Sequence, residues 1–512
     1  MVLPTARFPS GKYYALTWGI SDGYGGMTSA LLHRSRAFHR LGGIPVEILT
    51  TDDRPDYAEL AERLLDSGEL TEGVTLRNLW DDLRERTLAP AKIQKTQIEA
   101  ALPLEADEND LLTQHGGIVL KRERVGAGQK FVAADRFRRD GSLLATERRI
   151  KGGRSIVIYD LQGAPVRRFK SRWKLYHWWL DLVFKRHLSF VVVDSKTSAR
   201  FMPDYRRDNV VAVHLVHASH REDARDAPLG VLGAATQPVL RETRAAVLKR
   251  SGDFDSVVVL TERQRAELLE DLLALGVDAR GVIRVIPNGI DLPMRSASDH
   301  VRGAGVMLAS LDERKRVEHA IDAMVEAHAT VPQTTLDVYG GGDRAEELLA
   351  QINRQNADSF VSLRGYRSDA RAKFASADFS LLTSTSEGLP LVLVEGMAAG
   401  CVPIAYDVRY GPADMIQDGV SGYLVEEGDI SLLAKRIVEL QRMPEAQLRA
   451  MRQRAVARAK EFSDEAIAKR WANEFARALD AKRIRAAADD ALAIRLRRRA
   501  GVVRRRLGRM LG

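Results

Sequence analysis

The sequence predicts an α/β protein with two doubly wound parallel halves, and three observations lead to this fold class. Short Val-rich runs such as residues 190–194 and 256–260 are apolar on both faces, which is typical of parallel strands covered by helices on both sides. Helical patterns alternate with these runs. The alternation stops near residues 286–289 (Ile-Pro-Asn-Gly) and restarts after Gly303, and 512 residues, 45% of them hydrophobic, suffice for several cores.

The first half opens with a strand, a glycine-bearing loop and a helix. Residues 13–18 indicate the strand, residues 19–26 the loop and residues 28–41 the helix. A second strand is expected at residues 46–50. Because ligands of doubly wound sheets bind at the carboxyl ends of strands, the loop is a candidate binding element.

Residues 101–172 follow a different pattern, which predicts an antiparallel insertion. Polar and apolar residues alternate in period two around two turn signals, Asp140-Gly141 and Gln162-Gly163. Two roles are open for it: a solvent-exposed flap, or a surface for assembly or acceptor binding.

We therefore expect an N-terminal half over residues 1–295 that contains this insertion, and a C-terminal half over residues 296–460. A helix over 461–480 and a basic tail over 481–512 complete the chain. The strands expected in the second half are residues 306–309, 335–339, 360–363, 379–382 and 402–405.

The tail carries the whole charge excess of the chain. Residues 481–512 contain eleven Lys or Arg and two Asp, a difference equal to the net charge of +9. Apolar residues recur in it at helical spacing: Leu492, Leu496, Ala500, Val503, Leu507 and Met510. Three interpretations stay open: a basic amphipathic helix on an anionic membrane surface, an arm for a polyanionic ligand, and a solvated end. No aromatic platform accompanies the arginines, so nucleic acid is not an expected partner.

The cysteine content and the hydropathy favour a reducing compartment. The single cysteine, Cys401, excludes an internal disulfide and a metal site built from several cysteines. No run approaches the ~20 apolar residues of a membrane span, and residues 1–12 do not read as a secretory signal. We expect a cytoplasmic protein, with peripheral contact to the inner face of the membrane as the further possibility that the tail raises.

The most informative stretch is residues 383–397, where a strand, a small-residue loop and a helix follow one another. The helix is expected to open at about Pro390, so its first backbone N–H groups form a pocket suited to a phosphate oxygen or a sugar hydroxyl. Glu387 precedes this pocket and Glu395 lies about two turns into the helix. Carboxylates accept hydrogen bonds from vicinal hydroxyls, which favours a sugar and a ribose. The alternative is that the two glutamates simply solvate a helix end.

This Glu-x7-Glu pattern in the second of two Rossmann-like halves resembles the retaining GT-B glycosyltransferases of family four. The resemblance implies a nucleotide-sugar-binding C-terminal domain and an acceptor-binding N-terminal domain. It also implies that Glu387 is a catalytic residue that positions the sugar. By the same resemblance the sugar faces Gly388, Leu389 and Pro390, the diphosphate approaches Leu391 and Val392, and the ribose binds Glu395.

The family also places an arginine and a lysine five residues apart, where both neutralise the diphosphate. Lys315 fits the lysine, but Ser310 stands where the arginine is expected. Arg316 and Arg314 are candidates to supply the missing charge from the loop, with solvated surface charge as the alternative for both.

Two further elements match the family. Gly25 and Gly26 lie in the loop that resembles its opening glycine loop. His217 fits a histidine that hydrogen-bonds the transferred sugar, and His220 is the second choice. No third ligand of suitable spacing accompanies these histidines, so neither a metal nor another cofactor is expected.

Residues 406–416, 418–419 and 422–425 are similar to a subgroup of the family: poly(glycerol-phosphate) or teichoic-acid α-glycosyltransferases and the enzymes that glycosylate serine-rich adhesins. This resemblance implies metal-independent transfer of a hexose, glucose or N-acetylglucosamine, from a UDP-sugar to a cell-wall or surface polymer. It also implies self-association through the insertion. The alternatives are a protein O-glycosyltransferase, a non-catalytic companion subunit, which Ser310 favours, and a nucleotide-sugar epimerase.

Overall fold

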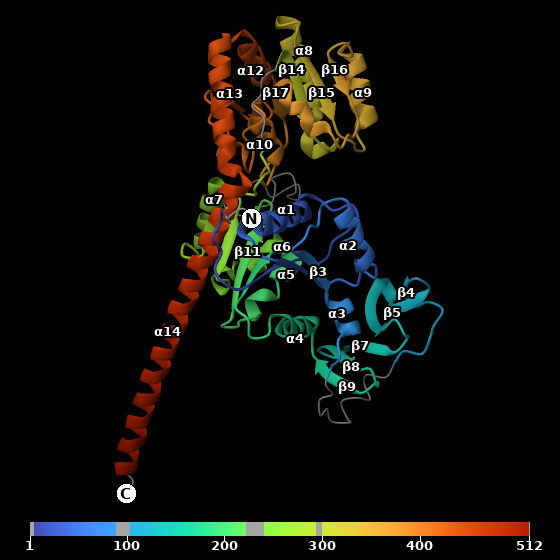
Figure 1. Ribbon diagram of the computed structural model, residues 1–512, viewed down its shortest axis with the longest axis vertical. Coiled ribbons are helices and arrows are strands. Elements are labelled where there is room, and N and C mark those ends of the chain that lie inside the picture. The colour runs from blue at the N-terminus through green and yellow to red at the C-terminus, as the bar shows by residue number, and fades with distance from the viewer. Residues whose placement is uncertain (1–4, 89–102, 222–239, 293–299, 511–512) are drawn as a thin grey trace. The chain divides into compact units, whose positions relative to one another are not determined.

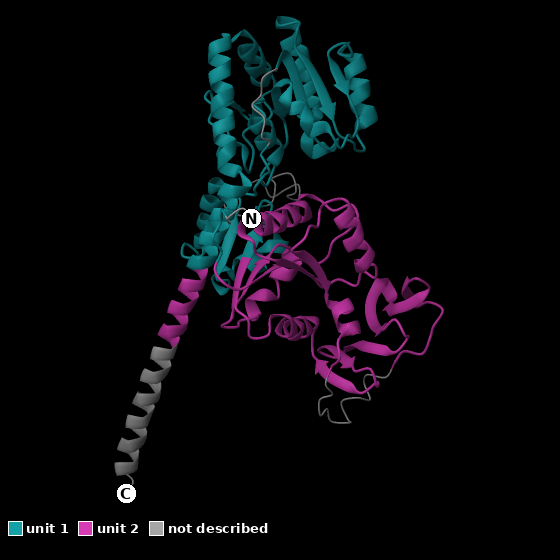
Figure 2. Ribbon diagram, in the orientation of Figure 1, with its two compact units in different colours: residues 1–8, 214–477 teal, residues 9–213, 478–512 magenta. Residues whose placement is uncertain are grey.

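The computed structural model describes residues 5–88, 103–221, 240–292 and 300–510, with the side chains of residues 490–510 excluded. The chain divides into two compact units, which are described separately (Figure 2). Unit 1 comprises residues 1–8 and 214–477, and unit 2 comprises residues 9–213 and 478–512. Within the described ranges, no helix has the length and apolar character needed to pass through a bilayer.

Unit 2 carries four neighbouring strands of a parallel sheet in the order β10-β1-β2-β3, and all of them except β3 are largely buried. The residue ranges are β1 (Lys12–Leu16), β2 (Val46–Thr50), β3 (Val74–Asn78) and β10 (Ser189–Val193). The accompanying helices are α1 (Gly26–Gly42), α2 (Tyr57–Asp66), α3 (Leu79–Glu85), α4 (Arg172–Phe184) and α5 (Lys196–Ala199). The predicted order of strand, glycine loop and helix is therefore confirmed for β1 and α1. The chain leaves unit 2 within β11 (Val210–Val216).

The antiparallel insertion is also confirmed, as a six-stranded meander (Figure 1). Its strands are β4 (Leu111–His115), β5 (Ile118–Gly126), β6 (Lys130–Phe137), β7 (Leu143–Ile150), β8 (Gly153–Tyr159) and β9 (Pro165–Phe169). Both predicted turns are present. Gly141 and Gly163 adopt φ values of 81° and 77°, a left-handed conformation that glycine tolerates best.

The insertion is tied to the rest of unit 2 by buried charges. The Arg136 guanidinium on β6 donates to the Asp53 carboxylate at 2.9 and 3.0 Å and stacks 3.9 Å from the Trp80 ring centre. Burial alone would raise the pKa of Asp53, but Arg136 and Lys121 hold that pKa far below its usual value. Removing one partner of such a pair leaves a buried, uncompensated charge, so this contact fixes the insertion firmly.

Unit 1 contains a second, six-stranded parallel sheet in the order β16-β15-β14-β17-β18-β19 (Figure 1). Its strands are β14 (Val301–Leu308), β15 (Thr335–Tyr339), β16 (Val361–Leu363), β17 (Ala377–Leu382), β18 (Val402–Tyr406) and β19 (Tyr423–Val425). Its helices are α8 (Val317–Thr330), α9 (Ala345–Arg354), α10 (Leu391–Ala398), α11 (Pro412–Met415), α12 (Ile430–Arg442) and α13 (Glu445–Ala459).

This sheet is covered on both faces, as its apolar strands predict. Neighbouring residues of β14 join different cores: Met307 packs in the cluster that includes Ile321 and Leu433, whereas Val306 packs with Phe374. Because successive strand residues point to opposite faces, the two clusters lie on opposite sides of the sheet. The predicted doubly wound fold class is therefore confirmed.

Unit 1 also holds the remaining elements of the first half, namely α6 (Glu242–Leu248), β12 (Ser256–Val259), α7 (Glu262–Ala274) and β13 (Ile283–Val285). A β-bridge joins Ile290 to Ser463, the residue that precedes α14 (Asp464–Met510). The expected C-terminal helix and basic tail thus form one helix of 47 residues. The apolar residues that suggest an amphipathic tail, Leu492 to Met510, lie outside the side chains that the structure describes.

Candidate active site

Glu387 lies in the loop between β17 and α10, at the carboxyl edge of the second sheet. Two backbone hydrogen bonds hold it against a neighbouring loop: Glu387 N–H donates to the Arg409 carbonyl, and Tyr410 N–H donates to the Glu387 carbonyl, both at 2.7 Å. These hydrogen bonds hold the backbone at Glu387 in place.

Lys315 meets Glu387 although 72 residues separate them in the chain. Its Nζ lies 2.6 Å from Glu387 Oε1, and the two side chains are 16% and 10% exposed. The loop that carries Lys315 is fastened to the Glu387 loop at two points. The Thr383 hydroxyl donates to the Lys315 carbonyl at 2.9 Å, and Thr385 N–H donates to the Arg314 carbonyl at 2.8 Å. The ammonium and the carboxylate are thus preassembled.

The structure distinguishes between the two arginines that could replace the missing family arginine. Arg314 Nη1 lies 3.6 Å from Glu387 Oε2, and this side chain is 47% exposed. Arg316 instead pairs with Glu427 at 2.5 Å and is 12% exposed. Ser310 donates to Asp312 Oδ2 at 2.5 Å and so supports the loop. Arg314 therefore lies beside Glu387, whereas Arg316 is engaged elsewhere.

The predicted helix start is confirmed, because Pro390 caps α10 and the helix begins at Leu391. Leu389 and Pro390 are buried, while Leu391 and Val392 keep partial exposure. On the same helix Glu395 Oε2 lies 3.1 Å from the guanidinium of the exposed Arg371. Because Arg371 is 75% exposed, water screens this pair, and such pairs contribute about 0–1 kcal/mol.

Gly388 is the point where the Glu387 loop meets the loop after β11. A Cβ built on Gly388 would lie 2.3 Å from the His217 carbonyl oxygen and 3.5 Å from Ala218 Cα. A glycine is required here because the two backbones approach too closely for a side chain. The structure thus brings Glu387, Gly388, Lys315 and His217 into one region of unit 1.

His220 has a different place from His217. It is fully buried, with Nε2 3.0 Å from Asp271 Oδ2 and Nδ1 3.4 Å from the Tyr410 hydroxyl. Burial lowers the pKa of His220 to about 4, so this ring is neutral at physiological pH. Of the two candidate histidines, His217 is the one whose backbone meets Gly388.

The support beneath Glu387 could not be read from the sequence. Glu267 on α7 accepts hydrogen bonds from the Tyr410 hydroxyl at 2.7 Å, Arg409 at 3.0 Å and Arg221 at 2.9 Å. Residues 409–410 are the ones whose backbone grips Glu387. Tyr410 belongs to the motif that the sequence singles out, whereas Glu267 lies in an ordinary amphipathic helix with no signal of its own.

Tyr366 is a second residue that sequence reasoning missed. It follows β16, is 82% exposed, and its Cβ lies 3.9 Å from a Cβ built on Gly341. An exposed aromatic ring above a glycine segment at the carboxyl edge of a parallel sheet offers a flat surface to a planar ligand.

The opening glycine loop belongs to unit 2. Gly25 caps α1 and Gly26 begins it. A Cβ built on either residue meets no described atom within 4 Å. A Cβ on Gly19 would instead lie 2.2 Å from the Asp52 carboxylate, whose pKa burial raises to about 6. Packing within unit 2 therefore requires Gly19, whereas it leaves space beside Gly25 and Gly26.

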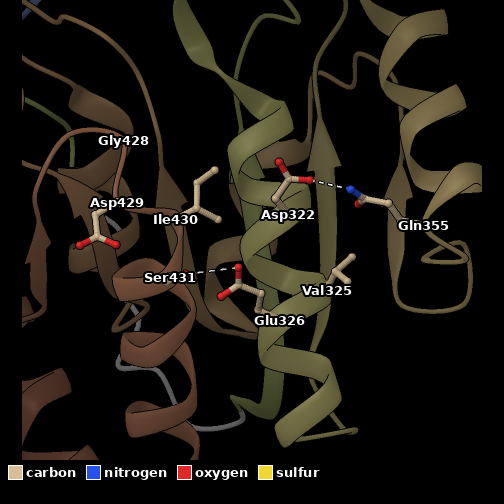
Figure 3. Close-up of a pocket in the computed structure, with 8 residues that line it drawn as sticks. All are labelled: Asp322, Val325, Glu326, Gln355, Gly428, Asp429, Ile430 and Ser431. Carbon is tan, nitrogen blue, oxygen red and sulfur yellow. Dashed lines mark hydrogen bonds between the residues drawn. The ribbon is translucent and has the colours of Figure 1, made fainter.

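The groove in Figure 3 lies among α8, α9 and α12 and measures about 580 Å³. Its lining residues are Asp322, Val325, Glu326, Gln355, Gly428, Asp429, Ile430 and Ser431. Asp322 accepts from Gln351 and Gln355, both at 2.7 Å, and Ser431 donates to Glu326 at 3.4 Å. None of the predicted site residues lines this groove, and its acidic groups are partnered within it.

Comparison with known proteins identifies the class to which this fold and site belong. Residues 303–462 match the family described as glycosyl transferases group 1. Over these residues the chain is similar to the glycosyltransferases of family four, and its two parallel sheets with an antiparallel insertion form the GT-B arrangement of its structural neighbours.

Two of the similar proteins are named for polyol-phosphate polymers. The chain is 23% identical to the poly(glycerol-phosphate) alpha-glucosyltransferase of Bacillus subtilis, over 91% of this chain and 75% of that protein. It is 22% identical to the poly(ribitol-phosphate) alpha-N-acetylglucosaminyltransferase of Staphylococcus aureus, over 84% and 92%. The crystal structure of an S. aureus TarM variant in complex with fondaparinux, alpha-GlcNAc-glycerol and UDP aligns with a TM-score of 0.64 and 19% identity, over 91% of this chain and 100% of that one.

Proposed function

We propose that the chain transfers a hexose from a UDP-sugar, with retention, to a polymer of the poly(glycerol-phosphate) type. The observation that carries the proposal is the preassembled pair of Lys315 and Glu387, beside the close approach of Gly388 to His217. A cation for the diphosphate and a carboxylate for the sugar hydroxyls lie at the carboxyl edge of a doubly wound sheet, where ligands of such folds bind.

In this proposal Lys315 and Arg314 bind the diphosphate and neutralise the charge that develops on it as it leaves. Lys315 then shares its ammonium between the phosphate and Glu387, whose carboxylate orients the sugar through its hydroxyls. His217 hydrogen-bonds the same sugar, Glu395 takes the ribose, and the exposed ring of Tyr366 offers a stacking surface for the base.

The transfer step itself needs no covalent intermediate. The acceptor hydroxyl attacks the anomeric carbon on the face from which the diphosphate departs. The new bond joins the acceptor oxygen to that carbon, and the bond to the β-phosphate oxygen breaks. The departing oxygen accepts the hydroxyl proton, so protons and electrons balance without a base from the protein.

The acceptor class rests on the similar proteins, whose names specify poly(glycerol-phosphate) and poly(ribitol-phosphate). The same names give glucose and N-acetylglucosamine as the sugars. Both sugars are therefore candidates for this chain.

Donor binding and turnover test the proposal directly. We expect UDP to raise the thermal unfolding midpoint of the full chain, because a ligand that binds the folded state stabilises it by mass action. We also expect UDP release from UDP-glucose or UDP-N-acetylglucosamine to accelerate when poly(glycerol phosphate) is added. If UDP causes no shift and neither donor is consumed with or without polymer, the proposal is wrong.

The same UDP titration decides between the two loop arginines. Arg314→Gln should raise the Kd of UDP about tenfold or more, since a hydrogen bond to a charged group contributes about 1.5–3 kcal/mol. Arg316→Gln is the matched control and should change the Kd less than about twofold, because Arg316 pairs with Glu427. Equal effects in the two variants would remove Arg314 from the site.

We further propose that residues 481–512 bind anionic membrane surfaces and that the β4–β9 sheet mediates self-association. The excess of positive charge in residues 481–512 supports membrane binding. In a sedimentation assay with anionic vesicles, truncation after Asp480 should abolish co-sedimentation, and neutral vesicles are the control. Unchanged binding of the truncated chain would refute membrane contact, and a monomer in light scattering would refute self-association.

A further inference from the structure

Arg244 differs from the other arginines around the loop after β11. It lies on α6, and its Nη1 donates to the Ala218 carbonyl at 3.2 Å. Three of these arginines are paired with acids: Arg221 with Asp271 at 2.6 Å, Arg409 with Glu267 at 3.0 Å, and Arg263 with Asp407 at 2.9 Å. Among the described residues, no carboxylate forms an ion pair with Arg244.

The hydrogen bond to Ala218 does not account for this arginine. The fully buried Gln264 already donates its Nε2 to the same carbonyl at 3.1 Å. The carbonyl therefore has a donor without Arg244, and this half-buried cation has no carboxylate partner in the part of the chain that the structure describes. Burial, and after it the nearby Arg241, lowers the pKa of Arg244 to about 10, so an anion beside this guanidinium would stabilise its charge.

The position of Arg244 relates it to the reaction site. The residue that it contacts, Ala218, follows His217, and Ala218 Cα lies 3.5 Å from a Cβ built on Gly388. Arg244 therefore contacts a residue, Ala218, that takes part in the close approach between the Glu387 loop and the His217 loop. An anion bound here would neutralise the cation.

We propose that Arg244 binds a phosphate group of the anionic acceptor polymer next to the loop that carries His217. The inference rests on the proposed function and names the charged part of its acceptor. Phosphate could also come from the donor. The acceptor is favoured because Lys315 and Arg314, which lie beside Glu387, already supply cations for the diphosphate.

Binding of a fluorescent glycerol-phosphate hexamer to the full chain, without donor, tests the proposal. Arg244→Gln removes the charge but can still donate to Ala218, so it separates anion binding from support of the loop. We expect the Kd of the hexamer to rise about tenfold in Arg244→Gln. Arg244→Lys should retain most of the affinity, and added salt should weaken the wild type more than the Gln variant.

Arg250→Gln is the matched control, because Arg250 follows the same helix and pairs with Asp253 at 2.7 Å. Its Kd should stay within about twofold of the wild-type value. An unchanged hexamer affinity in Arg244→Gln would overturn the proposal. So would a rise in the Kd of UDP equal to that for the hexamer, which would assign Arg244 to the donor. If the wild type binds neither UDP nor the hexamer, the proposed function itself fails.

Discussion

Glu387→Gln is expected to lower the rate of sugar transfer by about 10²–10³, the usual cost of removing one preorganised group that acts on the transition state. The variant keeps the shape of the side chain and loses its charge. Lys315 then loses the carboxylate that lies 2.6 Å from its ammonium and holds it in place beside the diphosphate. The sugar hydroxyls also lose a charged hydrogen-bond acceptor. The measurement is kcat/KM for transfer from the UDP-sugar to poly(glycerol phosphate).

The backbone of this loop should survive the change. The hydrogen bonds that hold it, from Glu387 N–H to Arg409 and from Tyr410 N–H to Glu387, do not involve the side chain. Circular dichroism should therefore match the wild type. Glu427→Gln is the matched control, since Glu427 also pairs with a basic residue of the same loop, Arg316, but lies outside the proposed site. Wild-type activity in Glu387→Gln would remove this residue from the mechanism.

The sequence predicts the parts of the site that local chemistry determines. Glu387, Gly388 and the start of α10 follow from a strand, a small-residue loop and a proline, all within a few residues of each other. Lys315 follows from the resemblance to family four, which places a lysine after β14. These positions depend on the carboxyl ends of parallel strands lying at one edge of the sheet, which the fold class already implies.

What the sequence could not predict depends on partners far away in the chain. His217 and His220 have the same residue type and differ by three positions. His220 is buried because Asp271, on α7, and Tyr410, after β18, surround it. No local pattern near the histidines encodes those contacts. Glu267 and Arg244 carry no sequence signal for the same reason. Glu267 matters through the hydrogen bonds that it accepts from distant residues, and Arg244 through having no carboxylate partner among the described residues.

The exposure of Tyr366 and the engagement of Arg316 are also properties of the folded chain. In the sequence, Arg314 and Arg316 are equivalent candidates for the charge missing at Ser310. The structure separates them because Arg316 adopts a left-handed conformation (φ 44°) at the start of α8 and reaches Glu427. Arg314 is left on the side of Glu387.

Gly388→Ala is expected to reduce kcat about a hundredfold although it adds a single methyl group. That methyl would lie 2.3 Å from the His217 carbonyl oxygen, a backbone atom that cannot rotate away. One of the two loops must shift by about 1 Å, and a misplacement of that size can cost about 10²-fold in rate. The overpacking itself should destabilise the fold by about 1–3 kcal/mol, which a lower unfolding midpoint would report.

Gly388→Ala should change kcat without an equal change in donor affinity. Lys315 and Arg314 lie in a different loop, so the Kd of UDP should change much less than kcat. Gly252→Ala is the matched control, because a Cβ there meets no described atom within 4 Å and its backbone is not left-handed. It should leave both constants within about twofold. If Gly388→Ala transferred sugar at the wild-type rate, the contact between the Glu387 and His217 loops would have no part in aligning the donor, and the proposed site would lose its geometric basis.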